Sequence, residues 1–103
     1  MKTLNITTRT SGDVTIVDLD GRIRIGEGST DLHEHVRVLS GQGAKMVLLN
    51  MEKVSHIDSS GLGELVSAYT TLQNAGGELK LFSLSDRVHE LMTMTKLLTV
   101  FDL

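Results

Sequence analysis

MVLLNMEKVSHIDSSGLGELVSAYTTLQNA, from Met46 to Ala75, is the stretch of sequence that decides the fold. Its first part, Met46 to Met51, is an almost unbroken apolar run, which predicts a strand covered on both faces in the middle of a sheet. A polar link from Glu52 to Ile57 then leads to the sequence Asp58-Ser59-Ser60-Gly61-Leu62-Gly63. Beyond this motif, apolar residues recur at the spacing of an amphipathic helix. These residues are Leu62, Leu65, Val66, Tyr69 and Leu72.

The end of this helix and the next apolar run complete a strand–helix–strand unit. The sequence Asn74-Ala75-Gly76-Gly77 predicts the helix end, because Asn and Gly accept the left-handed backbone of a C-terminal cap. A second apolar run, from Leu79 to Leu84, follows. A strand, a helix and a strand of these lengths predict a βαβ unit, in which the two strands run parallel.

The two serines of the motif lie at the junction between the predicted buried strand and the predicted helix. Asp58 or Ser59 can cap the free N–H groups of the first turn. The partial positive charge of a helix start also favours an anion there. Gly61 and Gly63 are unusual in a first turn, because glycine lowers helix stability. Two explanations remain open: the helix packs closely on the sheet, or another molecule approaches this backbone closely.

Composition narrows the class of protein. A chain of 103 residues is long enough for one domain with a single core. It contains no cysteine, which excludes disulfide bonds and thiolate metal sites. A net charge of −3 and the lack of a basic stripe argue against nucleic-acid binding. Neither a signal peptide nor a run of membrane-spanning length is apparent, so a cytoplasmic protein without membrane contact is expected.

Further elements are predicted on either side of the central stretch. The alternation from Leu4 to Thr8 and the β-branched run from Val14 to Leu19 flank a short turn, which predicts an antiparallel hairpin. Residues 21–28 are interpreted as a loop or a short extended piece. A helix follows to about Leu39, with Ser29, Thr30 and Asp31 as possible caps, and Asp31 with Glu34 resembles a capping box.

The C-terminal part is predicted to hold a third helix. Ser83 or Ser85 starts it, and its apolar residues recur at helical spacing. Residues 97–103 are interpreted as a last strand or a helical end.

Other chemistry fits the sequence poorly. Val66 stands where a dinucleotide-binding fingerprint needs glycine. Asp58, Ser59 and His56 are adjacent in sequence, which does not give the geometry of a catalytic triad, and the nucleophile elbow of hydrolases is absent. His33 and His35 lie two residues apart on a helix, so they point to different faces. They are interpreted as surface residues, and no metal site is predicted.

The segments from Val47 to Met51 and from Val54 to Gly63 resemble the signature of the STAS-domain anti-sigma factor antagonists. The resemblance extends over nearly the whole chain. Gly21-Arg22-Ile23 is similar to the family pattern of glycine, any residue and a hydrophobic residue after the second strand. Gly76 to Leu81 resembles the strand after the central helix, and Val88 to Phe101 resembles the C-terminal helix and its ending. The Asp-Ser-Ser-Gly-Leu-Gly motif at this place in a βαβ unit is fairly specific.

The resemblance implies a fold and a switch. The implied fold is α/β, a single STAS domain over residues 1–103, with a small mixed sheet of four or five strands and three or four helices mainly on one face. The implied protein is a bacterial, non-enzymatic regulator of transcription in stress responses, without a cofactor. Its unphosphorylated form binds an anti-sigma factor that is also a serine kinase of the GHKL type, and so frees the sigma factor. Phosphorylation at Ser59, with Ser60 as the alternative, ends binding, and a PP2C-type phosphatase reverses it.

The partner-binding surface implied by the resemblance surrounds this serine. It consists of Arg24, His56, Asp58, Ser59, Ser60, Gly61, Leu62 and Gly63. Arg24 departs from the family, because many members carry aspartate directly after the glycine triplet. If the loop from Arg24 to Ser29 touches the kinase, the partner is expected to differ from the usual one.

Three alternatives remain open. The first is a STAS scaffold or a partner-switching protein in a stressosome-like or non-sigma signalling assembly. The second is a small-molecule binding module that holds an anion at the turn from Ser59 to Gly63. The third is a hydrolase that uses Ser59.

Overall fold

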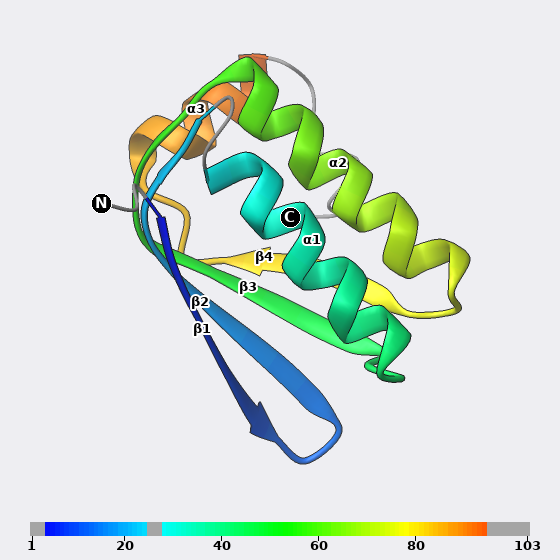
Figure 1. Cartoon of the computed structure of the whole chain (residues 1–103). Coiled ribbons are helices and arrows are strands. Elements are labelled where there is room, and N and C mark those ends of the chain that lie inside the picture. The colour runs from blue at the N-terminus through cyan, green and yellow to red at the C-terminus, as the bar shows by residue number, and fades with distance from the viewer. Residues whose placement is uncertain (1–3, 25–27, 95–103) are drawn as a thin grey trace.

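The computed structural model describes residues 4–24 and 28–94 (Figure 1). Its elements in chain order are β1 (Leu4–Ser11), β2 (Val14–Ile23), α1 (Gly28–Gly41), β3 (Met46–Ile57), α2 (Ser59–Asn74), β4 (Glu78–Phe82) and α3 (Asp86–Met94). The four strands form one sheet in the order β1-β2-β3-β4. The described residues therefore have the α/β architecture with a small mixed sheet that the sequence predicts.

The sheet is mixed because its first pair of strands is antiparallel and the next two pairs are parallel. β1 and β2 form the predicted hairpin, and Gly12 in its turn has a φ of 63°, which favours glycine. β3, α2 and β4 form the predicted βαβ unit, with the strands in register from Met46↔Glu78 to Asn50↔Phe82. β3 is therefore paired along both of its edges.

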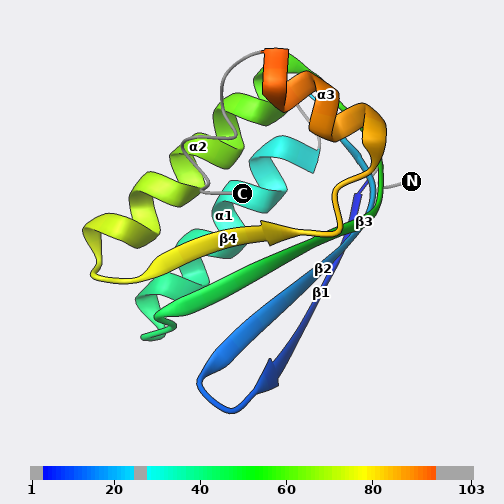
Figure 2. The same cartoon turned by 180° about the vertical axis from the view of Figure 1, so that it is seen from behind.

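Two helices cover one face of the sheet. α1 and α2 lie side by side on this face, and α3 lies at the end of β3 near the start of α2 (Figure 1). The view from behind shows the opposite face of the strands, which no described helix covers (Figure 2). The core lies between the sheet and the helices and is aliphatic. Its fully buried side chains include Val17, Val36, Val47, Leu49, Met51, Leu65, Leu72 and Met92.

The expectation that β3 is covered on both faces is wrong within the described residues. Burial alternates along the strand: Val47 and Leu49 are fully buried, whereas Leu48 on the other face is only partly buried. An apolar run can occupy a strand with one half-covered face, because neighbouring side chains of the same face shelter one another.

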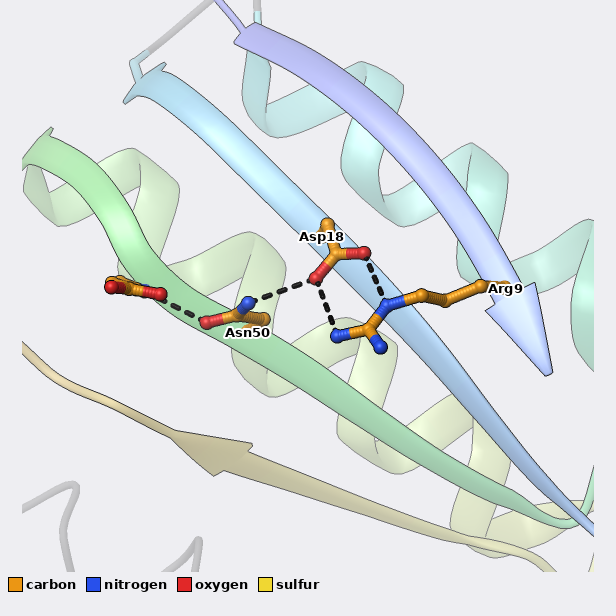
Figure 3. A network of polar contacts seen from close by, with 4 residues as sticks. Arg9, Asp18 and Asn50 are labelled. Atoms are coloured by element: carbon orange, nitrogen blue, oxygen red, sulfur yellow. Dashed lines mark hydrogen bonds and ion pairs between the residues drawn. The ribbon is translucent and has the colours of Figure 1, made fainter. Parts of the chain in front are cut away.

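A chain of polar contacts crosses the uncovered face of the sheet (Figure 3). Arg9 of β1 donates from Nε to Oδ2 of Asp18 on β2 over 2.7 Å, and Asn50 of β3 donates from Nδ2 to Oδ1 of Asp18 over 2.8 Å. The hydrogen bond from Arg9, and after it the one from Asn50, hold the pKa of the Asp18 carboxyl below its ordinary value. Hydrogen bonds and charge thus join three strands on the uncovered face.

β2 and β3 both extend farther than the sequence suggests. β2 continues to Ile23, and β3 runs through the residues interpreted as a polar link, because parallel pairing continues to Ile23↔Ile57. The polar residues Ser55 and His56 make this part of β3 resemble a loop in the sequence. Only Val54 and Ile57 are buried there. The long strands carry the pairing up to the start of α2.

The starts of α3 and α1 test the caps that the sequence predicts. Ser85 rather than Ser83 caps α3, because its Oγ accepts from the Val88 N–H over 3.2 Å. Ser83 instead adopts a left-handed backbone with a φ of 59°. α1 begins at Gly28, so the capping box interpreted from Asp31 and Glu34 is wrong. Asp31 lies within the first turn, and the Glu34 carboxylate pairs with Arg37.

The last predicted element, over residues 97–103, lies outside the described residues.

Candidate functional site

The start of α2 is fixed by Asp58, which links it to β2. The Asp58 side chain accepts from the Gly61 N–H over 2.7 Å, so it is the N-cap residue of the helix. The Asp58 N–H donates to the carbonyl of Ile23, at the end of β2, over 3.2 Å. Of the two possible caps, Asp58 is the one used. Ser59 is then the first residue of the helix, and its hydroxyl is not the cap.

The two glycines of the first turn have different surroundings. A Cβ at Gly61 would lie 2.5 Å from the carbonyl oxygen of Ile23 and 2.9 Å from a side-chain carbon of Ile57. Close packing on the sheet therefore explains Gly61. A Cβ at Gly63 would meet nothing within 4 Å, and Gly63 is exposed. Packing within the described residues does not require glycine at this second position.

The turn presents some of the predicted site residues to solvent and buries others. Ser59 and Gly63 are exposed, and so is Arg24. Three others are partly buried: His56, Asp58 and Ser60. Gly61 and Leu62 are buried and lie beneath the turn. Ser59 is therefore the more accessible of the two serines, and a hydroxyl at a helix start can carry an anionic group that the helix dipole stabilises.

A basic hollow lies beside the turn. It has a volume of about 440 Å³ and is lined by Arg22, Arg24, Ser55, His56 and Arg87, which we call the arginine hollow. Its residues come from the end of β2 and the residue that follows it, from the end of β3, and from α3. The sequence suggested Arg24 and His56 as site residues but not Arg22, Ser55 or Arg87. The alternation of Arg22 and Arg24 was the only local signal for a shared surface.

An adjoining hollow of about 270 Å³ shares two residues with the arginine hollow, His56 and Arg87. Its other lining residues are mostly apolar: Ile57, Val88, Leu91 and Met94, with Glu90. The surface next to the serine turn is therefore concave, cationic on one side and apolar on the other.

The histidines of α1 make contacts between elements. His33 Nδ1 lies 2.8 Å from a carboxylate oxygen of Glu64 on α2. His35 points to β1, where its Nε2 is 2.5 Å from the hydroxyl of Thr8, and burial lowers its pKa. The prediction that they point to different faces is confirmed, but both are half-buried rather than freely exposed.

Within residues 4–24 and 28–94, no cluster of three His, Cys, Asp or Glu side chains could hold a metal ion. None of the helices in these ranges has both the length and the apolar character needed to cross a bilayer.

The domain thus has an α/β fold, and its helix α2 begins with an Asp58 cap and an exposed Ser59. These features can be compared with those of known proteins. Residues 5–103 match the family model of the STAS domain. The chain is 30% identical over 100 residues to the anti-sigma-B factor antagonist of Bacillus subtilis (strain 168), covering 97% of this chain and 90% of that protein. It is 31% identical over 94 residues to the anti-sigma-B factor antagonist of Staphylococcus aureus (strain NCTC 8325 / PS 47), covering 91% and 86%. The chain belongs to the STAS domain family.

The fold agrees with this assignment. The crystal structure of an anti-sigma factor antagonist from Mycobacterium paratuberculosis superposes with a TM-score of 0.83 over 95% of this chain and 82% of that chain. The sequences are 16% identical, so this likeness shows the fold alone.

Proposed function

We propose that this protein is an anti-sigma factor antagonist whose binding is switched by phosphorylation of Ser59. The observation that carries the proposal is the exposed hydroxyl of Ser59 at the first position of α2, next to the N-cap Asp58. The proposal is supported by two anti-sigma-B factor antagonists that align over more than nine-tenths of the chain. Ser60 is partly buried, which makes it the weaker candidate.

Electrostatics explains why phosphorylation of Ser59 would weaken binding of the partner. A phosphate on Ser59 adds a charge of roughly −1.5 to −2 at pH 7. The helix start stabilises such a charge by about 0.3–1 kcal/mol at an exposed site, so the domain stays folded. A partner surface docked over Ser59 then meets a new charge, and an apolar or acidic surface is repelled. A local modification thus breaks an interface without remodelling the domain.

The proposed partners follow from the family. The unphosphorylated protein binds an anti-sigma factor that is a serine kinase of the GHKL type, and the sigma factor is released. The same kinase phosphorylates Ser59, and a PP2C-type phosphatase restores the free hydroxyl. The protein itself acts as a binding module in the cytoplasm, as a single domain over residues 1–103, and carries out no catalysis.

The test is capture of partners from a native lysate of the source bacterium, with Ser59→Ala and Ser59→Asp as baits. The alanine bait is expected to retain a kinase of the GHKL type, and the aspartate bait is expected to lose it. Ser11→Asp places the same charge at an exposed position at the end of β1, so it serves as the matched control and should bind normally.

Two outcomes would contradict the proposal. A phosphorylation site mapped elsewhere, with Ser59 unmodified in growing and stressed cells, would remove the switch. Capture of one large assembly by both Ser59 baits would instead favour the scaffold alternative.

A further inference from the structure

The arginine hollow concentrates positive charge in a chain whose net charge is −3. Its three arginines approach from two directions: Arg22 and Arg24 from the end of β2, and Arg87 from the first turn of α3. His56 and Ser55 of β3 lie between them in the lining. A chain with excess negative charge that gathers arginines at one place has a local surface of opposite sign.

These arginines differ from two other arginines of the structure. Arg9 is paired with Asp18 and Arg37 with Glu34. Within the described ranges, no ion pair involves Arg22, Arg24 or Arg87. A guanidinium carries five N–H donors in a planar fork that fits a carboxylate or phosphate, and it keeps its charge at all physiological pH values. The hollow therefore offers three cations to an anion from outside.

The arginine hollow adjoins the proposed phosphorylation site. Parallel pairing places Arg22 opposite His56, and the Asp58 N–H bonds to Ile23 between Arg22 and Arg24. Ser59 follows His56 by three residues, so the two Cα atoms are at most about 10 Å apart. This is roughly one Debye length at 0.1 M salt, so at low ionic strength a charge on Ser59 reaches the His56 side of the lining of the hollow.

We propose that the arginine hollow binds an acidic segment of the partner protein, whose carboxylates pair with Arg22, Arg24 and Arg87. The inference rests on the proposed function and names the chemistry of the partner at that site. It gives phosphorylation a second effect, because a phosphate on Ser59, with a charge of roughly −1.5 to −2, offsets part of the positive charge of the three arginines as well as repelling the acidic segment. Both effects weaken binding of the acidic segment.

The first experiment uses a fluorescently labelled polyglutamate peptide and the full chain. Binding is followed by fluorescence anisotropy, and the contact surface is mapped by ¹H–¹⁵N chemical shifts. We expect saturable binding that perturbs the amides of Arg22, Arg24, His56 and Arg87. Because the whole chain is negative, binding must come from a local surface. It should weaken as ionic strength rises from about 0.01 M to about 0.15 M, where the Debye length falls from roughly 30 Å to 8 Å.

Two double variants with the same change in net charge separate the hollow from general electrostatics. Arg24→Gln/Arg87→Gln removes two charges from the hollow, and we expect the affinity to fall about tenfold, as the loss of two exposed ion pairs implies. Arg9→Gln/Arg37→Gln removes two charges from the uncovered sheet face and from α1, and we expect little change. Thermal melts establish that both variants are folded.

Three results would overturn the inference: no binding at low ionic strength, shifts centred away from the hollow, or equal losses in both double variants. Inorganic phosphate is the second probe. If it displaces the peptide, and the peptide binds no more tightly than free glutamate, the hollow is a site for small anions and the inference fails.

The peptide assay contains no kinase, so its outcome is independent of partner capture by the Ser59 baits. In the same assay, Ser59→Asp should weaken peptide binding, whereas Ser59→Ala should not. Failure here together with capture by Ser59→Ala would leave the proposed function standing and remove only the acidic partner.

Discussion

The two sides of the first turn of α2 differ in packing and in exposure to solvent. On the inward side, Gly61 presses against the carbonyl of Ile23, and the Asp58 cap ties the turn to β2. On the outward side, Ser59 and Gly63 face solvent, with open space where a side chain at Gly63 would stand. The difference teaches that one short motif can hold two glycines for unrelated reasons. The inward residues contribute to stability, whereas the outward residues are accessible to other molecules.

The largest effect is expected at Gly61. In Gly61→Ala, the new methyl group would lie 2.5 Å from a backbone oxygen, which cannot move aside like a flexible side chain. We expect the free energy of unfolding to fall by about 1–3 kcal/mol, the usual cost of overpacking. Urea unfolding followed by circular dichroism measures it. Unchanged stability would mean that helix and strand are not in close contact.

Gly63→Ala is the matched change on the outward side. Alanine is the better helix former by about 0.8–1.0 kcal/mol and meets no neighbour, so we expect the unfolding free energy to rise by up to that amount. We also expect weaker capture of the partner if that partner approaches this backbone. A stabler variant with unaltered binding would show that the outward glycine has no role in docking.

Removal of the N-cap should have an intermediate effect. We expect Asp58→Ala to lower the unfolding free energy by about 1 kcal/mol, because the Gly61 N–H loses its acceptor. Asp58→Asn keeps an oxygen in place and should restore most of the stability. Chemical denaturation of the two variants side by side measures this. Equal losses in both would show that the negative charge, rather than the cap, is what matters.

The smallest effect is expected far from the turn, at Asp18 on the uncovered sheet face. Its pKa is lowered in the folded state, chiefly by Arg9. The pair therefore stabilises the protein above the ordinary Asp pKa of about 4, and this contribution is lost as the pH falls through the lower folded value. Arg9 is exposed and Asp18 is partly exposed, so water screens the pair and the contribution is small. In Asp18→Asn, thermal melts should depend less on pH below about 4.

Asp13→Asn is the control for that series, because Asp13 is exposed in the hairpin turn. Its melting temperature should follow the pH as that of the unaltered protein does. A parallel change in both variants would show that overall charge, not the pair with Arg9, sets the acid response.

Much of the fold was predictable because its signals are local. The apolar run from Met46, the turn at Gly12 and the glycines that end α2 each specify an element within a few residues. The ends of the strands were not predictable. Ser55 and His56 look like loop residues, and only pairing with β2, distant in sequence, keeps them in a strand.

The local geometry of the candidate site was predictable for the same reason. The cap and first turn form within the motif from Asp58 to Gly63, so the helix start could be placed from the sequence. Arg22 and Arg87 come together only through the packing of α3 beside the end of β3. No spacing in the sequence brings two such distant side chains together, so the arginine hollow was missed.

The strand order β1-β2-β3-β4 is also the order of synthesis. Each strand can therefore pair with the strand synthesised just before it, so the sheet can grow before the C-terminus is made. β2 and β3 each have one edge that needs a later partner, because β3 emerges only after the 14 residues of α1 and β4 only after the 16 residues of α2. At about 5–20 residues per second, the synthesis of either helix takes on the order of one to three seconds. During translation, the unpaired edge of β2, and after it the unpaired edge of β3, are therefore the places where a neighbouring nascent chain could pair wrongly.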